Sequence, residues 1–310
     1  MTDRTLLGLA LMLGFCATAP LIDVFSKLAA GTLAVGEVTA ARFAVQGALM
    51  LPFALGAGLG APRALLHPLL LRAACLVVST FAFVSAIDRM PLADALAIVF
   101  VMPFVLLVLG RLVMGDVVGP RRVAASGVGF AGALLVVQPS FAEFGAVALW
   151  PLLTAVSFAG YMLVTRGLAG RIGGAAMQVH TSLLATLMCL PFLLLGEWRG
   201  WEAFDPSMPE AQAGAWLLGV GAASAASHWL MTEALRCAPS ATLAPLQYLE
   251  IVSAATLSWW VWGDWPDALT WAGIGVIVLS GLYVIHRERL ASAARRASPP
   301  PPRAAPRAAG

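Results

Sequence analysis

Charged side chains are scarce in this chain: Asp, Glu, Lys and Arg together make up only 11% of its 310 residues. A soluble domain carries roughly 25% charged residues. Hydrophobic residues instead reach 60%, and the mean hydropathy is +0.86. This balance excludes a water-soluble globular fold, and it favours a protein that lies within a membrane.

Residues that bind metals, form disulfides or bind nucleotides are also few. The four cysteines lie in or at the ends of apolar stretches without a CxxC pair, so we predict packing roles for them. The four histidines are scattered along the chain, whereas a metal-dependent membrane enzyme needs clustered ligands. No GxxxxGK segment is present, which excludes an ATP-driven pump. We therefore predict a protein that is not an enzyme and that uses no metal or other cofactor.

Apolar stretches, in contrast, fill the chain from end to end. About 20 apolar residues of helix cross the hydrocarbon core of a bilayer, and the connections here are too short to fold as separate domains. We predict an all-α polytopic membrane protein with ten transmembrane helices. Their expected ranges are 5–26, 34–55, 66–87, 92–114, 122–138, 146–165, 173–195, 212–234, 240–262 and 267–286.

The placement of lysine and arginine predicts the orientation. These residues favour cytoplasmic loops, and most of those that flank the ten stretches fall on the side of the N-terminus. We therefore predict a bacterial-type inner-membrane protein, multi-pass, with both termini in the cytoplasm. The first stretch is compatible with a signal peptide, but Pro20 follows the candidate cleavage site and the apolar run continues, so we expect this stretch to be retained.

The sequence also contains an internal repeat. An offset of 148 residues aligns 86–136 with 234–284 without a gap, and an offset of 139 aligns the earlier parts of the two halves. Because each half holds an odd number of helices, the second half must enter the membrane upside down. We predict two inverted five-helix repeats, 1–139 and 140–286, followed by a disordered basic tail at 287–310 that is rich in Pro, Ala and Arg. The aligned positions include Pro91 with Pro239, Asp116 with Asp264, and Lys27 with Arg166.

Two paired segments carry a family resemblance. PLADALAIVFVMPF and PSATLAPLQYLEIV, each followed by Gly-Asp and a glycine-containing helix, resemble the EamA family of the drug/metabolite transporter superfamily. Many members have Gly-Glu where this chain has Gly-Asp. The resemblance implies an inner-membrane transporter of small metabolites, with a cavity lined by helices 1–4 and 6–9 and with helices 5 and 10 at the periphery.

Three shorter segments resemble the branch of this family that includes S-adenosylmethionine uptake carriers and riboflavin carriers. They are Asp23 to Lys27, Glu37 to Phe43, and Gln247 to Glu250. This resemblance implies uptake of a cofactor-like metabolite. The wider family implies the alternative, efflux of amino acids, metabolites or drugs.

Charged residues deep inside apolar helices are the first candidates for a binding or coupling site. Glu250 lies about ten residues into the ninth stretch, where a carboxylate is costly unless it is protonated, paired or hydrated. It is a candidate for binding a cationic group or a coupled proton; the alternative is a structural hydrogen bond to a neighbouring helix. Arg42 is the deepest basic residue, with Gln46 one turn along the same face. Arg42 is predicted to pair with Glu250 or an anionic substrate group, or alternatively with Glu37 near the interface.

Further polar residues complete the candidate substrate-binding set. Asp23 and Lys27 are four positions apart and fit either a gate contact or an interfacial ion pair. Tyr248 and Gln247 precede Glu250 directly. His228 lies in the eighth stretch, where the alternatives are packing with a hydrogen bond and a proton relay.

Prolines inside apolar stretches predict helix breaks. Pro20, Pro103 and Pro245 each remove a backbone hydrogen bond within a predicted transmembrane helix. The freed carbonyl groups are available to a substrate or to a hinge, and a simple kink is the alternative.

Together these features predict a secondary transporter that moves a small polar metabolite by alternating access. A polytopic membrane enzyme that acts on lipid-linked substrates is the alternative of another class. The expected partners are a small-molecule substrate and membrane lipids, with no nucleic acid. The peripheral helices are the candidate surface for a homodimer.

Overall fold

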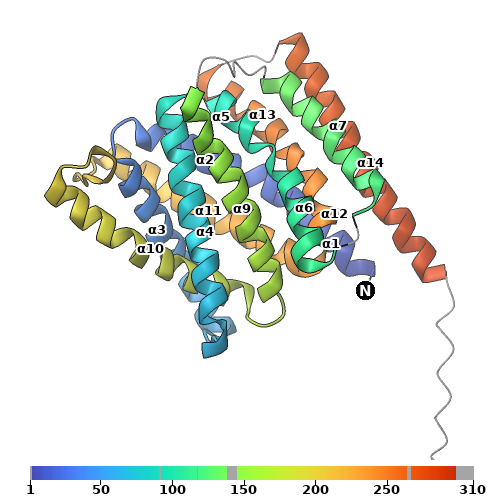
Figure 1. Cartoon of the computed structure of the whole chain (residues 1–310), viewed down its shortest axis with the longest axis horizontal. Coiled ribbons are helices and arrows are strands. Elements are labelled where there is room, and N and C mark those ends of the chain that lie inside the picture. The colour runs from blue at the N-terminus through green and yellow to red at the C-terminus, as the bar shows by residue number, and fades with distance from the viewer. Residues whose placement is uncertain (1, 91, 117, 138–144, 264–266, 298–310) are drawn as a thin grey trace, which may run out of the picture.

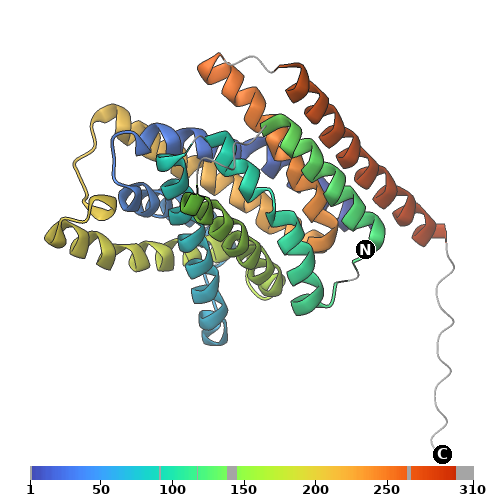
Figure 2. The same cartoon turned by 45° about the horizontal axis from the view of Figure 1, so that its top comes forward.

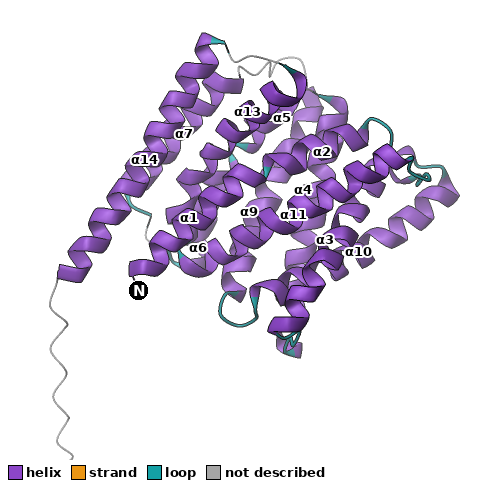
Figure 3. Cartoon of the chain, turned by 180° about the vertical axis from the view of Figure 1, so that it is seen from behind, coloured by secondary structure: helices purple, strands orange, loops and turns teal. Residues whose placement is uncertain are grey.

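The structure is a computed structural model that describes residues 2–90, 92–116, 118–137, 145–263 and 267–297, and these residues fold almost entirely into helices (Figure 1). Seen from behind, the same bundle shows loops only as short connections between helices (Figure 3). In the described residues the sole β-type contact is an isolated bridge between Ala169 and Ile172. The predicted all-α class is therefore confirmed.

Each predicted apolar stretch corresponds to one helix or to a run of shorter ones. The α-helices are α1 (Thr2–Thr18), α2 (Pro20–Ala30), α3 (Val35–Ala57), α4 (Leu66–Arg89), α5 (Leu92–Val99), α6 (Met102–Met114), α7 (Pro120–Val137), α9 (Leu149–Leu168), α10 (Gly174–Arg199), α11 (Ala211–Cys237), α12 (Ser240–Leu243), α13 (Glu250–Trp262) and α14 (Ala268–Ala297). The 3₁₀ turns are η1 (Arg63–Leu65), η2 (Gly145–Ala148), η3 (Glu202–Phe204) and η4 (Ala244–Leu249).

Length and apolarity agree with a multi-pass membrane protein. Six helical stretches of the described chain are both long and apolar enough to cross a bilayer: Arg4–Ala30, Val35–Ala57, Arg63–Arg89, Gly145–Leu168, Gly174–Arg199 and Ala268–Arg287. Two shorter apolar helices, Met102–Met114 and Val123–Val136, accompany them. Large apolar side chains such as Leu112 and Phe53 are exposed, whereas Arg72 and Gln178 are buried. This arrangement suits a surface that faces lipid.

Three predicted transmembrane stretches are interrupted, and a predicted proline lies at each interruption. Pro20 begins α2 directly after α1, and Pro103 lies in the first turn of α6 after α5 ends. Pro245 lies in the first turn of η4, between α12 and α13. Proline is tolerated at the start of a helix because the N–H that it lacks has no partner there.

Helices from distant parts of the chain pack against each other. The most extensive contacts join α3 to α10, α4 to α9, α1 to α11 and α7 to α14. In Figure 1, and in the turned view of Figure 2, α7 and α14 lie side by side along one flank of the bundle, while α3 and α10 lie at the opposite flank. Helices α2, α4, α9 and α11 lie between these flanks, so the centre of the bundle is built from both halves of the sequence.

The last helix departs from the prediction for the tail. Disorder was expected from residue 287, but α14 continues to Ala297. Ala, Leu, Arg and Glu are strong helix formers, and here they extend a helix that is already nucleated. The helix ends before the run of prolines that starts at Pro299. Residues 298–310 lie outside the described residues, as do the repeat positions Pro91 and Asp264.

Candidate functional site

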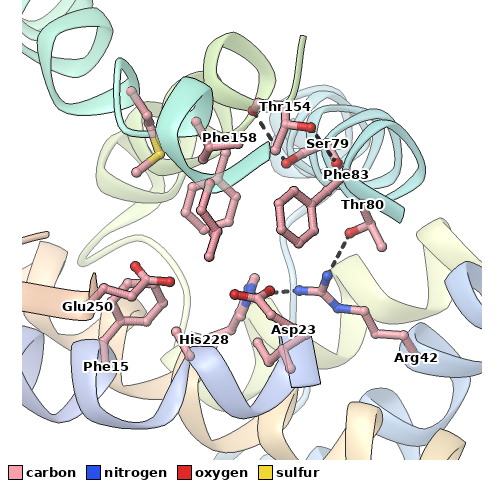
Figure 4. Close-up of a pocket in the computed structure, with 15 residues that line it drawn as sticks. Phe15, Asp23, Arg42, Ser79, Thr80, Phe83, Thr154, Phe158, His228 and Glu250 are labelled. Carbon is pink, nitrogen blue, oxygen red and sulfur yellow. Dashed lines mark hydrogen bonds between the residues drawn. The ribbon is translucent and has the colours of Figure 1, made fainter. Parts of the chain in front are cut away.

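A cavity of about 90 Å³ lies at the centre of the bundle, where the interrupted helices meet (Figure 4). Its walls come from α1, α2, α3, α4, α5, α6, α9, α11 and α13. Pockets that enclose a small organic ligand usually measure roughly 300–1,000 Å³. The cavity therefore accepts water in this conformation, and a metabolite requires it to widen.

Arg42 of α3 lies at the cavity wall and is 7% exposed. Its Nη1 donates to the Thr80 hydroxyl over 2.8 Å, and its Nη2 lies 2.8 Å from Nε2 of His228. Its Nε–H has no hydrogen-bond partner among the described residues. A buried guanidinium with an unused donor is costly, but this Nε is also inaccessible in this conformation, so it meets an acceptor only after the cavity widens.

Two carboxylates lie in the same cavity as Arg42. Asp23 of α2 points toward the guanidinium in Figure 4, and Glu250 projects from the first turn of α13. The 3₁₀ turn η4 leads directly into α13, and the Glu250 N–H bonds to the Gln247 and Tyr248 carbonyls. This acid therefore lies within a continuous helical run at the point where the helix changes type.

Aromatic and hydroxyl side chains form the remaining wall. Phe83 and Phe158 flank the space above Asp23 in Figure 4. Ser79 and Thr154 link α4 to α9, since the Thr154 hydroxyl donates to the Ser79 carbonyl over 3.3 Å. The cavity thus combines opposite charges with flat apolar faces.

Behind the cavity, a fully buried polar network surrounds His228. Its Nδ1 lies 3.0 Å from the Tyr161 hydroxyl, which also accepts a hydrogen bond of 2.7 Å from Nη2 of Arg72. Gln178 donates to the His228 carbonyl over 2.7 Å. Gln46 donates to the Gln178 side chain over 3.0 Å, so it joins this network rather than the cavity wall.

The sequence-predicted site residues are only partly brought together. Asp23, Arg42, His228 and Glu250 line one cavity. Among the described residues the Arg42 guanidinium bonds to Thr80 and His228, and not to the predicted partners Glu250 or Glu37.

The other predicted residues lie away from the cavity. Tyr248 is buried against α7 and donates to the Phe100 carbonyl over 3.1 Å. The side-chain amide of Gln247 contacts the sulfur of Met162 at 3.0 Å. Lys27 is exposed, whereas Asp23 points inward, so these two side chains face different surroundings. Tyr248, Gln247 and Lys27 do not line the described cavity, and their direct involvement with a substrate stays a prediction.

Several contributors to the site are not evident from the sequence pattern. Arg72, Tyr161, Gln178 and Thr80 were not singled out, although Arg72 is a charged residue within an apolar helix and offered the same signal as Arg42. The other three are uncharged residues. The roles of all four depend on contacts between residues that are 38 to 160 positions apart.

A second polar cluster lies at the end of the bundle that carries both termini. Nη2 of Arg166, at the end of α9, lies 3.1 Å from Oδ1 of Asp116, which follows the end of α6. Nη1 donates to Oδ2 over 3.1 Å, so the pair is bidentate. The Ser240 hydroxyl, at the start of α12, donates to the same Oδ2 over 2.8 Å. Asp116, interpreted from the sequence as a mark of the repeat, thus joins three segments.

Comparison with known proteins places these features in context. The sequence profile of the EamA-like transporter family matches residues 6–138 and again 145–286. A solved structure, titled only as a crystal structure of a protein, matches with a TM-score of 0.72 at 19% identity, over 96% of this chain and 100% of that one. At this identity the match shows a shared fold.

Three curated relatives are transporters. A riboflavin transporter of Rhizobium johnstonii is 28% identical over 207 residues, or 67% of this chain and 66% of its own. An S-adenosylmethionine uptake transporter of Rickettsia prowazekii is 22% identical over 94% of this chain and 96% of its own. A pseudopaline exporter of Pseudomonas aeruginosa is 28% identical over 88% of this chain and 93% of its own.

Proposed function

Because the chain belongs to the EamA-like transporter family, within the drug/metabolite transporter superfamily, we propose that it is a secondary transporter that takes up a cofactor-like metabolite by alternating access. The observation that carries this proposal is the central cavity, which is lined by Asp23 and Glu250 of two interrupted stretches and by Arg42 of α3. A charged side chain inside the membrane is costly unless it binds a ligand or an ion or pairs with another group of the protein.

The chemistry of the cavity supports a substrate with a planar ring, with acceptor groups for Arg42 and with cationic or donor groups for the carboxylates. The unused Arg42 donor suits a carbonyl or anionic oxygen. The carboxylates of Asp23 and Glu250 suit a cationic or hydrogen-bond-donating group, and Phe83 and Phe158 offer faces for stacking. Riboflavin and S-adenosylmethionine, the substrates named for two relatives, both combine a planar heterocycle with polar groups, so they are the first compounds to test.

The inverted-repeat architecture is part of the proposal, and helix geometry supports it. Helices α6 and α13 both hold 13 residues, and their first residues, Met102 and Glu250, are related by the 148-residue offset. Each helix ends at a glycine with positive φ, 67° at Gly115 and 79° at Gly263. The contact of α4 with α9 is the repeat equivalent of the contact of α11 with α1.

Alternating access requires a closed barrier on one side of the site. The Arg166–Asp116 pair, with Ser240, joins the two proposed repeats at the end that carries both termini. We propose that this cluster is the gate on that side and that it separates when the cavity opens there. In the membrane we place both termini in the cytoplasm, with α7 and α14 as the candidate homodimer surface.

Export is the second candidate, and one observation favours it: the similarity to a pseudopaline exporter extends over 93% of that protein. An inverted-repeat carrier works in either direction, and the gradient decides which one prevails. The two candidates therefore share a site and differ in the compound and in the driving force.

The test is accumulation of labelled riboflavin, S-adenosylmethionine and amino acids in cells with and without the protein. The proposal predicts faster accumulation of one of the two cofactor-like compounds. Slower net accumulation of a compound than in control cells would favour export, and no change for any compound would contradict the proposed substrate class.

Coupling is tested in proteoliposomes with the compound that is transported. We expect Glu250→Gln to abolish concentrative uptake while exchange continues, because the amide can neither take up nor release a proton. Glu233→Gln is the matched control, since Glu233 pairs with Arg236 on the exposed face of α11 and lies outside the cavity. Unchanged concentrative uptake by the Glu250 variant would exclude the coupling role.

A further inference from the structure

Arg72 of α4 is a fully buried arginine that lies outside the cavity. It makes five hydrogen bonds, each to an uncharged group: the hydroxyls of Thr165, Thr181, Tyr161 and Thr232, and the Met177 carbonyl. None of these partners, in the described part of the chain, is a carboxylate. Its guanidinium also lies 4.4 Å from the centre of the Tyr161 ring.

Packing alone does not explain a charge at this position. A buried charge without a counter-ion is costly, and well-packed apolar residues can replace buried ionic groups with little loss of stability. The hydrogen bonds also do not require arginine as such, because hydroxyl groups can pair with one another. Arginine differs from the surrounding hydroxyl groups because its guanidinium donates several hydrogen bonds and accepts none.

This property fixes the direction of the hydrogen bonds around His228. Arg42 is also only a donor, so Nε2 of His228, 2.8 Å from its Nη2, must accept. His228 then carries its proton on Nδ1 and donates it to the Tyr161 hydroxyl oxygen over 3.0 Å. Arg72 donates to that same oxygen over 2.7 Å. A chain of hydrogen bonds therefore runs from Arg42 through the neutral imidazole of His228 to the Tyr161 oxygen, and Arg72 donates to that oxygen from the other side.

We infer that Arg72 is a positioning residue for the substrate site, acting on Arg42 through Tyr161 and His228. Arg72 anchors the Tyr161 oxygen as an acceptor, Tyr161 holds the imidazole ring, and the ring holds Nη2 of Arg42. Thr80 holds Nη1 from the other side. The guanidinium is thereby fixed at the cavity wall, with its Nε–H unbonded to any residue that the structure describes. The inference rests on the proposed function only for the role of Arg42 as a substrate contact.

The same geometry gives His228 a defined role. As long as Arg42 donates to Nε2, this nitrogen has no free lone pair for a proton. His228 therefore acts as a neutral spacer between Tyr161 and Arg42 in this conformation, which answers the alternative of a proton relay that the sequence left open. Coupling to protons, where it occurs, belongs to the carboxylates of the cavity.

The first test measures the hydrogen bonds of His228 in the absence of any substrate. Purified protein is labelled with ¹⁵N-histidine, after replacement of the other histidines, His67, His180 and His286. We expect the spectrum of a neutral imidazole protonated at Nδ1, with slow exchange of that proton. Arg72→Lys and Tyr161→Phe should each accelerate its exchange about tenfold or more, because the anchored acceptor is lost.

The second test uses substrate affinity, with riboflavin or S-adenosylmethionine as the probe, whichever is transported. Arg72→Lys and Tyr161→Phe should each raise KM about tenfold with little change in maximal rate, and the double variant should be no worse than either single variant. Two residues that act in one chain give such non-additive effects. Thr181→Val is the matched control, because it removes a partner of Arg72 that lies outside the chain to His228.

The outcomes separate the inference from the proposed function. If the His228 spectrum does not respond to Arg72→Lys or Tyr161→Phe, or if Thr181→Val alters it equally, Arg72 only joins helices and the inference is wrong. Additive effects of the two variants on KM would contradict it as well. Failure to transport either probe would contradict the proposed substrate class. The His228 spectrum alone would then decide whether Arg72 acts through Tyr161 and His228.

Discussion

The proposed gate at the end of the bundle that carries the termini leads to a quantitative prediction. Asp116→Asn keeps the shape of the side chain and one acceptor for Ser240, but it removes the charge that Arg166 contacts through one hydrogen bond and one ion-pair contact. A barrier built on this pair should open more often. The population of molecules that are open toward the termini should rise.

The burial of the two partners gives the size of the effect. The Asp116 side chain is 7% exposed and the Arg166 side chain is 22% exposed. Fully exposed ion pairs contribute about 0.2–1 kcal/mol, whereas hydrogen bonds to charged groups contribute about 1.5–3 kcal/mol. A value of about 1–2 kcal/mol lies between these limits. It corresponds to an increase of about 5–30-fold in the ratio of open to closed molecules.

Thiol labelling measures this ratio. Ser79→Cys places a reporter at the cavity wall, in a background in which the four native cysteines are replaced. A membrane-impermeant reagent is added to the side of the membrane that holds both termini. We expect Asp116→Asn to increase the initial labelling rate about 5–30-fold, and the exchanged pair Asp116→Arg with Arg166→Asp to restore it in part.

The control is a second ion pair that does not cross an interface. Glu233 and Arg236 lie 2.8 Å apart within α11, on the exposed face of a single helix. Glu233→Gln makes the same change of charge in a pair within one helix, where the carboxylate lies beside Gly174 at the start of α10, and it should leave the labelling rate unchanged. Equal rates for Asp116→Asn and the parent protein would refute the gate, and equal acceleration by Glu233→Gln would indicate a general charge effect.

Three further predictions concern packing and the cavity. Gly129→Ala should lower the unfolding temperature in detergent, because an added Cβ would lie 2.5 Å from the Tyr248 ring, whereas Gly127→Ala, with open space around it, should keep or raise that temperature; the reverse order would contradict the described packing of α7. Phe158→Ala should weaken binding of a planar substrate several-fold, since a stacked pair contributes about 0.5–1.5 kcal/mol, and titration of purified protein would reveal an unchanged affinity if this wall is not used. Thr80→Val should raise the KM for transport several-fold, because it removes the acceptor for Arg42, and an unchanged KM would show that the guanidinium does not need this support.

The fold could be predicted from the sequence to the level of helices and their breaks. Apolar length determines where a chain can cross a bilayer, and proline removes a backbone donor wherever it occurs. Both signals are local, so α3, α4 and α10 and the interruptions at Pro20, Pro103 and Pro245 follow from reading along the chain. The composition of the tail predicts disorder from residue 287, but its Ala, Leu and Arg residues also favour helix, and α14 extends to Ala297.

Only some residues of the candidate site could be predicted from the sequence in this way. Glu250 and Arg42 stand out because a charge in an apolar run is conspicuous wherever it points. The partners of Arg42 do not, since Thr80 and His228 are 38 and 186 positions away and one of them is an ordinary hydroxyl. Tyr248 lies two positions before Glu250, yet it faces α7 rather than the cavity. The 3₁₀ geometry of η4 changes which residues share a face, and the sequence alone does not reveal that change.

The most direct measurement of the central claim is a structure of the protein in a bilayer mimic with its transported compound bound. The account predicts that the compound lies between Arg42 and Glu250, with an oxygen or nitrogen acceptor within hydrogen-bond distance of the Arg42 guanidinium. A compound bound elsewhere, for example in the apolar groove between α7 and α14 that Val128 and Leu279 line, would contradict it.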